Sequence, residues 1–440
     1  MKKVTRRRFL QRVGASAAGV GLCAAEGGNA VAATPKTSAN DRIVLGFIGV
    51  GGMGRSHFDR LLFHPEVHVA AAADPDAHHL EAARKQAAGL RIAIDTYNDF
   101  RELVARDDID AVFVATPDHW HALAAVAAMK TGKDVYCEKP LTLTIAEGQE
   151  MIACARCYAR VVQMGTQQRS DQDQFRHACE LVRNGRIGAL ERIVCFFGPN
   201  PVRPYQPNED PPPYLDWVLW LGPAPWRPYN SAIHPYNFRY FRDYSGGLLT
   251  DWGVHLFDIA QWGAGKDHTG PKRIEAEGEM YVDNLYEYPA RMHVQYDYGD
   301  VVFEWFQGDY PGRIPDGGFE PGQGYGTKFY GTDGAVFVNR ERYTLHPKPG
   351  KTIHEAFGPN DIRLYDAPGH HQDFLNCMRT RRMPICDVAI GHRTTSISHL
   401  GNIAYRLGRP LEYDPAAETF PNDPIANRML AKPMRAPRRL

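Results

Sequence analysis

Three ionisable residues occupy positions where their side chains can meet and move a proton. Lys139 directly follows a short apolar run, and a partly desolvated lysine can donate a proton to a reacting oxygen or lose its own. Asp251 and His255 are four residues apart in a segment that predicts one helix beginning after Gly246-Gly247, which places both on one helical face. His255 is the better base at neutral pH, and Asp251 can orient it or hold a substrate hydroxyl. The three residues predict acid–base chemistry at a carbon that bears a hydroxyl group.

Each of these residues also has a purely structural interpretation. Asp251 can be a helix N-cap, His255 a buried imidazole with satisfied hydrogen bonds, and Lys139 a cation on a surface loop. A metal site is a further possibility, because His119 and His121 are present together with His255. No paired spacing of metal ligands accompanies these histidines, so we expect no metal.

A glycine-rich turn indicates where a nucleotide binds. Residues 43–48 form an apolar run typical of a buried parallel strand and lead into a G-x-G-x-x-G pattern at residues 49–54, which a helical stretch follows. Gly49 permits the tight turn, Gly51 lets the backbone approach a pyrophosphate, and Gly54 allows the helix to pack closely on the strand. We expect the phosphates at the helix N-terminus, where free N–H groups and the helix dipole favour anions.

The second expected strand, residues 67–73, ends in an acidic residue that bears on the choice of cofactor. Asp74 is expected to accept hydrogen bonds from the ribose hydroxyls of adenosine. A second acid at Asp76, and the lack of a nearby Arg or Lys in the sequence, argue against a bound 2′-phosphate. The pattern therefore favours NAD over NADP.

The alternation of strands and helices continues and predicts the α/β class. Apolar runs at residues 111–115, 134–137 and 161–165 are typical of strands, and helical stretches separate them. This order is typical of a doubly wound parallel sheet, here an N-terminal Rossmann domain over residues 42–165, in which ligands bind at the carboxyl ends of the strands.

The second half of the chain, residues 166–415, predicts an α+β domain followed by a C-terminal tail over residues 416–440. Its expected strands are rich in β-branched and aromatic residues and lie at residues 190–197, 272–283, 291–297, 301–307 and 327–338. Helices expected at residues 371–381 and 394–407 would pack back on the first domain.

An insertion at residues 199–245 is rich in proline and crowded with aromatic residues. A structureless loop of this length inside a domain is usually functional. Flat aromatic rings that stack on the C–H faces of sugars are the expected use, and a packed lid without a ligand role is the alternative.

These motifs, taken in order, resemble the Gfo/Idh/MocA family, the group of glucose–fructose oxidoreductase and inositol dehydrogenase. The resemblance rests on GxGxxG, the Asp at the end of the second strand, ATPDHWH, CEKPL and GGLLTDWGVHLFDIAQW, and it covers roughly residues 41–415. It implies a Rossmann domain followed by a domain on a large, mainly antiparallel sheet with helices on one face. The substrate, a sugar or cyclitol, would lie between the two domains against the nicotinamide.

The resemblance and the strand ends together define the expected site. The catalytic residues would be Lys139, Asp251 and His255. The residues expected to contact the cofactor are Gly49, Gly51, Gly52, Met53, Gly54, Asp74, Thr116, Pro117, His121, Glu138, Lys139 and Gln168. The residues expected to contact the substrate are Arg169, Tyr236, Asp251 and His255.

The chain begins with a segment that resembles a twin-arginine export signal. Residues 5–11 (TRRRFLQ) precede an uncharged Ala/Gly-rich run at residues 13–25, which is too short for a permanent membrane span, and residues 30–32 (AVA) fit a cleavage site. We therefore expect a removed signal over residues 1–33, a linker over residues 34–41, contact with the twin-arginine translocon, and a periplasmic or other extracytoplasmic location. A basic N-terminal tail is the alternative. Because this route carries folded proteins, we expect a tightly held cofactor that travels with the protein.

The composition excludes several classes of protein. The 440 residues hold 51 Lys and Arg against 51 Asp and Glu, with 43% hydrophobic residues, which excludes a disordered, collagen-like or coiled-coil chain. The balanced charge gives no reason to expect nucleic acid or an anionic membrane as a partner. Residues 1–33 hold six basic residues and one acidic residue, so the chain without them is mildly acidic.

Three functions from different classes fit the sequence. The leading hypothesis is an oxidoreductase that acts on a secondary hydroxyl of a sugar or cyclitol. The second is a redox-neutral glycosidase or lyase, in which bound NAD oxidises a ring hydroxyl and recovers its original state after elimination. The third is a non-catalytic sugar- or nucleotide-binding protein, against which the intact set of Lys139, Asp251 and His255 argues. A homo-oligomer, either a dimer or a tetramer, is expected if one face of the large sheet is exposed.

Overall fold

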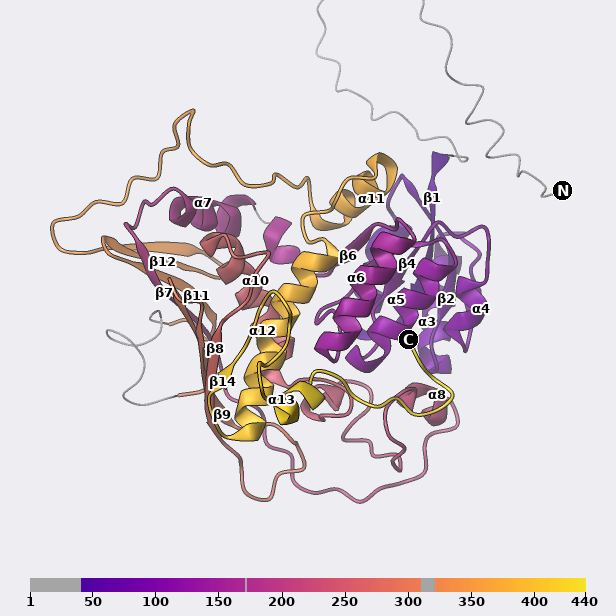
Figure 1. The fold of residues 1–440 in the computed structure, drawn as a ribbon. Helices are drawn as coiled ribbons and strands as arrows, with labels where there is room; N and C mark the ends of the chain where they lie inside the picture. Colours follow the sequence, from indigo (N-terminus) through magenta and orange to yellow (C-terminus); the bar gives the residue numbers. More distant parts are fainter. Residues whose placement is uncertain (1–40, 171, 310–319, 321) are drawn as a thin grey trace, which may run out of the picture. The chain divides into compact units, whose positions relative to one another are not determined.

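Two β-sheets, one parallel and one mainly antiparallel, carry the fold of the computed structural model, with helices between and around them (Figure 1). The structure describes residues 41–170, 172–309, 320 and 322–440. This arrangement confirms the predicted α/β class, with a Rossmann sheet first and a large, mostly antiparallel sheet second. The predicted export signal and residues 34–40 of the predicted linker lie outside the described residues.

The first sheet has six parallel strands in the order β3-β2-β1-β4-β5-β6. They are β1 (Ile43–Ile48), β2 (Val67–Ala73), β3 (Asp95–Tyr97), β4 (Ala111–Val114), β5 (Asp134–Cys137) and β6 (Val162–Met164). The strand order reverses between β1 and β4, and in open α/β sheets the crevice beyond the carboxyl ends of such strands is where ligands bind.

Helices cover both faces of this sheet, which is why its strands are apolar almost throughout. One face packs against α4 (Phe100–Val104), α5 (Asp118–Lys130) and α6 (Ile145–Cys157). The other face packs against α2 (Gly52–Leu62), α3 (Ala77–Gly89) and the C-terminal helix α11 (His370–Thr380).

The second sheet has eight strands in the order β13-β12-β11-β7-β10-β9-β8-β14. They are β7 (Leu190–Phe197), β8 (Arg273–Glu279), β9 (Arg291–Asp297), β10 (Val302–Gln307), β11 (Gly326–Gly331), β12 (Gly334–Val338), β13 (Tyr343–Pro347) and β14 (Leu411–Glu412). Only β7 and β10 pair in parallel among the described strands of this sheet. The predicted run at residues 327–338 is a hairpin of two strands, β11 and β12.

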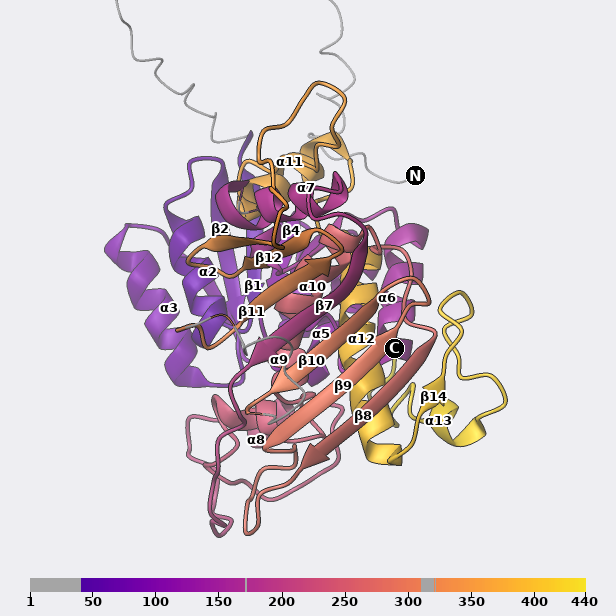
Figure 2. The ribbon, with the colours of Figure 1, turned by 90° about the vertical axis from the view of Figure 1, so that its left-hand side faces the viewer.

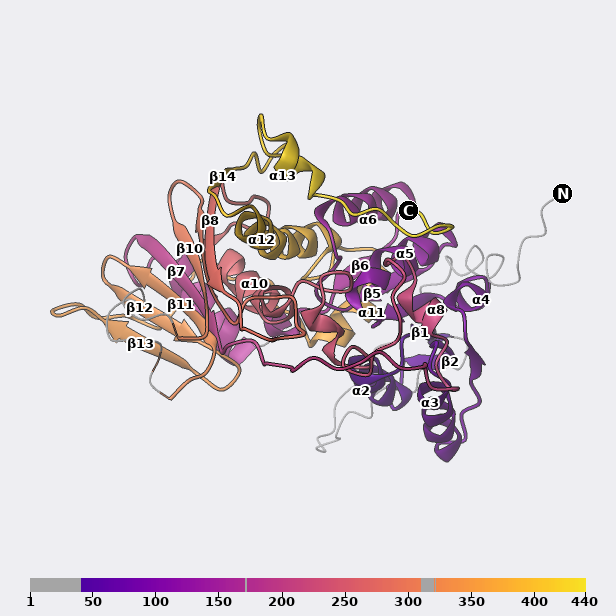
Figure 3. The same cartoon turned by 90° about the horizontal axis from the view of Figure 1, so that it is seen from below.

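One face of the large sheet packs against helices that also reach the first domain. Figures 2 and 3 show α10 (Gly253–Ala264) and α12 (Val388–Leu407) on this inner face, and α7 (His177–Arg183) packs there too. Residues 253–263 of α10 are all buried, as expected for a helix enclosed between a sheet and other helices. Because α12 contacts both β8 and α6, the two domains share one continuous packed interior.

The C-terminal part of the chain completes the core of the first domain. In α11 the ring of Phe374 packs edge-on against Phe113 and Tyr136, with ring centroids 5.7 and 5.9 Å apart. Arg381, directly after this helix, forms an ion pair with Asp134 at the start of β5 (Nη1 to Oδ2, 2.6 Å). The nucleotide-binding sheet is therefore built from both ends of the described chain.

The insertion at residues 199–245 has more order than the predicted structureless loop. It contains the short helix α8 (Trp217–Leu221), a 3₁₀ turn at Asn237–Tyr240 and a hydrophobic cluster of its own. Within this cluster the rings of Trp217 and Trp220 stack with centroids 4.7 Å apart. Most of the insertion's aromatic rings thus pack against one another, as the alternative interpretation of a packed lid expects.

Candidate active site

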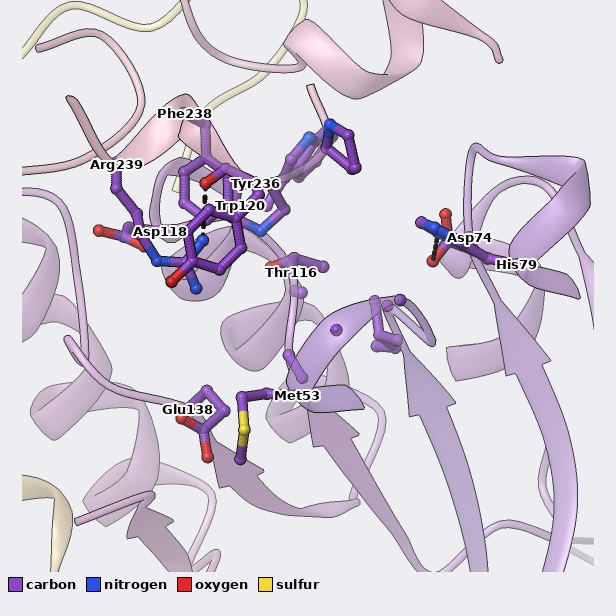
Figure 4. A pocket seen from close by; sticks show the side chains of 18 of the residues that line it. Met53, Asp74, His79, Thr116, Asp118, Trp120, Glu138, Tyr236, Phe238 and Arg239 are labelled. Atoms are coloured by element: carbon purple, nitrogen blue, oxygen red, sulfur yellow. Dashed lines mark hydrogen bonds and ion pairs between the residues drawn. The ribbon is translucent and has the colours of Figure 1, made fainter. Parts of the chain in front are cut away.

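A pocket of about 520 Å³ lies at the carboxyl ends of the parallel strands (Figure 4). The first domain lines it with the glycine turn after β1, Asp74 after β2, residues 115–118 after β4 and Glu138-Lys139 after β5. The second domain contributes residues 234–239, 251–255 and Arg340. The strand ends therefore bring together most of the residues predicted from the sequence.

The glycine turn has the backbone geometry that a pyrophosphate site requires. Gly49 has a φ of +84°, and a Cβ at this position would lie 2.7 Å from the carbonyl oxygen of Ala115. A Cβ on Gly54 would lie 2.0 Å from the carbonyl oxygen of Gly49, so the helix can approach the strand only with glycine there. The N-cap of α2 is Gly51, and no side chain caps it. The first N–H groups of α2 are therefore available to an anion, which fits the pyrophosphate of NAD.

Asp74 is fixed beside the glycine turn. Its Oδ2 accepts a hydrogen bond from the backbone N–H of Val50 (2.9 Å), and its Oδ1 accepts one from the N–H of Asp76 (2.9 Å). His79 Nδ1 lies 3.2 Å from Oδ2. Burial lowers the pKa of His79, but its hydrogen bond with Asp74 and the charges of Asp74 and Asp76 outweigh burial and raise it. The carboxylate lines the pocket in the position expected for a ribose ligand.

Asp74→Ala is expected to weaken NAD binding about tenfold or more, because the ribose hydroxyls lose a charged acceptor. Discrimination against NADP should relax, because the 2′-phosphate no longer meets a carboxylate. Asp74→Asn keeps an acceptor for Val50 and separates this effect from loosening of the turn. Fluorescence titration with NAD and with NADP measures the affinity of each variant for both cofactors. The substitution Asp107→Ala at an exposed position is the control. An unchanged preference between the two cofactors would remove Asp74 from the site.

Lys139 and Asp251 meet across the two domains. Lys139 Nζ donates to Asp251 Oδ1 at 2.6 Å and to the backbone oxygen of Asp251 at 2.9 Å. Arg239 Nε approaches the same carboxylate oxygen at 3.3 Å. Burial raises the pKa of Asp251, but the charges of Lys139 and Arg239 outweigh burial and hold it below its usual value. The site therefore holds an ionised carboxylate between two cations.

His255 lies near Lys139, and one of its ring nitrogens makes no hydrogen bond to a residue that the structure describes. The side chain lines the pocket and is only 4% exposed, and its Nδ1 has no hydrogen-bond partner within the described residues. Burial lowers the pKa of His255 well below its usual value, and the positive charges of Lys139, Arg340 and His370 lower it further. A neutral imidazole that lines the pocket can accept a proton at neutral pH.

The segment that carries Asp251 and His255 differs from the single helix predicted. It forms two helices, α9 (Leu248–Asp251) and α10, separated at Trp252. Asp251 is the last residue of α9 rather than an N-cap, and its carboxylate contacts Lys139 and Arg239. Because the helix is interrupted, the two side chains need not share one helical face, although both line the pocket.

Four predicted contact residues do not line the pocket: Gly54, His121, Gln168 and Arg169. The ring of His121 contacts the segments that follow β4 and β5. Its Nε2 lies 2.8 Å from the backbone oxygen of Thr116, and its Nδ1 lies 2.7 Å from that of Pro140. Gln168 is buried, and neither atom of its amide has a partner among the described residues. These two residues lie behind the wall of the pocket.

Arg169, expected to contact substrate, is placed inside the second domain instead. Its side chain is 1% exposed, and its Nε donates to Asp258 Oδ2 at 2.7 Å while its Nη2 donates to Asp267 Oδ1 at 2.6 Å. The guanidinium also lies over the ring of Trp262, 5.3 Å from the centroid. With its donors engaged in the interior, Arg169 has a structural rather than a ligand-binding environment.

The pocket residues that the sequence did not single out include the ionisable side chains of His79, Asp118, Arg239 and Arg340. Asp118 Oδ2 accepts a hydrogen bond from Ser245 Oγ at 2.5 Å, and burial raises the pKa of Asp118. Asp118 is the first residue of α5, four residues after the end of β4, and this position near a strand end was the indication in the sequence. The two arginines come from the insertion and from a β-turn, where no motif marks them.

Two features are absent from the described residues. No helix in the described ranges is both long and apolar enough to cross a membrane. Within the same ranges, no group of three or more His, Cys, Asp or Glu side chains is arranged to hold a metal ion.

Comparison with curated proteins gives relatives among oxidoreductases and glycosidases. The uncharacterized oxidoreductase YrbE of Bacillus subtilis is 28% identical over 243 residues, which are 55% of this chain and 59% of that protein. The alpha-N-acetylgalactosaminidase of Shewanella oneidensis is 31% identical over 207 residues, 43% of this chain and 45% of that protein. The chain thus spans about half the length of these curated relatives.

Solved structures share the fold over nearly their whole length. Myo-inositol 2-dehydrogenase from Lactobacillus plantarum superposes with a TM-score of 0.60 at 20% identity, covering 85% of this chain and 100% of that one. The WlbA dehydrogenase from Bordetella pertussis, solved in complex with NADH and UDP-GlcNAcA, superposes with a TM-score of 0.61 at 16% identity, covering 85% and 99%. At these identities the likeness establishes the fold.

Two family models match successive parts of the chain. The model described as oxidoreductase family, NAD-binding Rossmann fold, matches residues 43–166. The model described as oxidoreductase family, C-terminal alpha/beta domain, matches residues 196–309 and 359–440. The models follow one another as the two sheets do in the fold, and the chain therefore belongs to the Gfo/Idh/MocA family of NAD-dependent oxidoreductases.

Proposed function

We propose that the protein, after export by the twin-arginine route, oxidises a secondary hydroxyl of a sugar or cyclitol with an NAD molecule that it retains, and that a second substrate then takes up the hydride. The observation that carries the chemistry is the pair of Lys139 Nζ and Asp251 Oδ1, 2.6 Å apart, in one pocket with the neutral His255. The fold shared with an inositol dehydrogenase, and the similarity to an alpha-N-acetylgalactosaminidase, support a polyhydroxylated substrate. The N-terminal sequence alone supports the export step.

Different residues of the pocket bind the cofactor, accept the hydroxyl proton and stabilise the reacting oxygen. The N-terminus of α2 and Asp74 would hold the cofactor, and bound NAD would supply the hydride acceptor. His255, which lines the pocket, accepts the hydroxyl proton, because burial keeps the imidazole neutral. Lys139 donates to the reacting oxygen and stabilises the negative charge that develops there, while Asp251 fixes the direction of the ammonium group.

A segment of the insertion, which we call the adenosine strap (residues 214–216), pairs with residues 75–77, which follow Asp74 directly. The N–H of Ala77 donates to the oxygen of Tyr214 (2.8 Å), and the N–H of Asp216 donates to the oxygen of Pro75 (3.0 Å). The rings of Tyr214 and His78 stack with centroids 3.9 Å apart. The strap supports slow release of the cofactor, because these contacts join the insertion to the ribose end of the site.

We expect the purified protein to contain NAD, and Tyr214→Ala to release it about two- to tenfold faster, because the stacked pair is lost. Denaturing the protein and assaying the supernatant measures the content, and chase with unlabelled NAD measures the release rate. Tyr205→Ala is the matched control, since this tyrosine of the same insertion is 77% exposed. Protein that purifies empty, with activity strictly dependent on added NAD, would contradict retention.

A redox-neutral glycosidase or lyase is the second candidate function. The strap favours it, because a retained cofactor must be restored within the site, and the glycosidase relative at 31% identity favours it as well. The same three residues would serve, with oxidation of a ring hydroxyl preceding elimination.

A panel of sugars and glycosides, followed by absorbance at the nicotinamide band and by NMR of the products, separates these functions. Net reduction of the cofactor is the expected result for the oxidoreductase. Product formation without net reduction would replace it with the redox-neutral reaction. Neither signal with any compound would leave a binding protein. Lys139→Ala serves as the inactive control, because it removes the donor to the reacting oxygen.

A further inference from the structure

Two arginines lie on the substrate side of the pocket, on either side of Asp251-Trp252. Arg239 comes from the 3₁₀ turn of the insertion, and its Nε contacts the carboxylate of Asp251. Arg340 comes from the turn between β12 and β13, and its guanidinium lies over the ring of Trp252, 4.8 Å from the centroid. Both line the pocket. Arg239 thus lies against Asp251, and Arg340 is close enough to His255 for its charge to lower the pKa of the imidazole.

The guanidinium of Arg239 is held rigidly. It lies against the rings of Tyr236 and Phe238, 4.2 and 4.7 Å from their centroids, and its Nη1 donates to the backbone oxygen of Tyr236 at 2.8 Å. Its Nη2 has no hydrogen-bond partner among the residues that the structure describes. Stacked arginines lose little side-chain freedom when they bind an anion, so this unused donor is preorganised.

Arg340 is carried on a fixed turn. The side-chain oxygen of the buried Asn339 accepts from the N–H groups of Glu341 (2.9 Å) and Arg342 (3.0 Å), and the N–H of Asn339 donates to the oxygen of Arg342 (3.0 Å). This local pattern fixes the backbone on both sides of Arg340. In the described part of the chain no carboxylate forms an ion pair with Arg340.

Arg340 differs from the other two cations of the pocket, because Lys139 and Arg239 share the carboxylate of Asp251 and no described carboxylate pairs with Arg340. Two other carboxylates of the pocket are engaged with neighbouring side chains: Asp118 accepts from Ser245, and Glu138 Oε1 lies 2.8 Å from His57 Nε2. The positive charge of Arg340 is therefore available to a bound molecule.

The pyrophosphate does not account for this charge. Figure 4 shows Arg239, Tyr236 and Phe238 on one side of Thr116, and Asp74 with His79 on the other. The phosphates belong at the N-terminus of α2, next to Asp74, on the Rossmann side of the pocket. The two arginines flank the proton-transfer residues instead.

We propose that the substrate is an acidic sugar, whose carboxylate or phosphate ester is bound by Arg239 and Arg340 while a neighbouring hydroxyl reaches Lys139 and His255. Guanidinium groups present paired N–H donors that match both anions, so the two sources share one recognition chemistry. The inference rests on the proposed oxidation of a sugar hydroxyl and names its substrate class.

The test compares sugars that differ only at carbon 6. The NAD-loaded protein is titrated calorimetrically with glucose, galactose and mannose, with the corresponding uronates, and with the corresponding 6-phosphates. In at least one series we expect an acid to bind at least tenfold more tightly than the neutral sugar, and the preference to shrink as salt is raised. Uronate or phosphate as the tighter ligand identifies which anion the arginines take.

Arg340→Gln is the decisive variant, because Arg239→Gln would also remove one of the two cations from Asp251. In Arg340→Gln the ratio of acid to neutral affinity should fall about tenfold. Lys348→Gln removes the same charge from an exposed position just beyond β13, outside the pocket, and should leave the ratio unchanged. No acid preference in any series, or a ratio that survives Arg340→Gln, overturns the proposal.

The same samples keep this inference separate from the proposed function. Absorbance at the nicotinamide band and product NMR report chemistry, whereas calorimetry reports binding. Acids that bind tightly through Arg340 but are never converted would support the charge inference and contradict the oxidoreductase function. If neutral sugars are oxidised and acids bind no more tightly than they do, the oxidoreductase function is supported and the charge inference is contradicted.

Discussion

His255→Ala is expected to lower kcat by about 10²–10⁴, the usual contribution of a positioned acid–base group. The side chain comes from α10, away from the glycine turn and Asp74, so NAD affinity should be unchanged. Steady-state kinetics with the substrate found in the sugar panel, together with a cofactor titration, measures both quantities. The exposed His268→Ala, just beyond the same helix, is the matched control. A loss of less than about threefold would transfer the proton-accepting role to Lys139.

The assignment of His255 as the proton acceptor also predicts how kcat/KM falls at low pH. The pKa of His255 lies well below its usual value, because burial and the charges of Lys139, Arg340 and His370 disfavour the imidazolium. The imidazole is the base form above its pKa, so activity is lost only as the pH falls through that lowered value. We expect kcat/KM to stay level between pH 8 and about 6.5 and to decline only below that range. A decline centred near pH 7 would contradict a buried, neutral His255.

Arg169→Ala is expected to lower the free energy of unfolding by about 3–5 kcal/mol, the cost of leaving buried charges without their partner. The substitution strands Asp258, which is fully buried, and Asp267 in the interior of the second domain. Urea denaturation measures the loss. Arg84→Ala, which breaks the exposed pair with Glu81 on α3, should cost no more than about 0.5 kcal/mol.

A structural role for Arg169 also predicts that its substitution leaves the KM for the substrate unchanged. Folded Arg169→Ala protein at low temperature should keep the KM of the parent, because the side chain does not line the pocket. A stability loss below 1 kcal/mol together with a raised KM would restore the substrate contact expected from the sequence.

The sequence was most informative where a pattern is local. The glycine turn, the buried strands of the first sheet and the strands β7 and β9 are contiguous apolar or alternating runs, and their expected bounds agree with the structure to within a residue. The strand β3 has only three residues and shows no such pattern. The predicted helix after Gly247 was interrupted at Trp252, whose ring packs against Phe197 in the second sheet, a contact that helix periodicity does not register.

Residues whose partners are distant in the sequence could not be placed in this way. Arg169 follows a strand end, where ligands commonly bind, but its partners lie 89 and 98 residues further along the chain. Lys139 and Asp251 are 112 residues apart, and only the folded chain shows that they form an ion pair. Arg340 has no motif, and its position over Trp252 follows from the hairpin of β12 and β13.

The contribution of α11 to the first domain has a consequence for the order of events during synthesis. Phe374 and Leu375 belong to the same core as β1, β2 and α2, so the part of the nucleotide-binding sheet formed by Phe113 and Tyr136 lacks its cover on one face until residue 375 has left the ribosome. The glycine turn emerges more than three hundred residues earlier, before the core of its domain is complete. We therefore expect a nascent chain stopped before α11 to expose apolar surface and to need a chaperone. We likewise expect the core of the first domain to be completed late in synthesis, and this domain not to fold alone when the chain is cut between the two sheets.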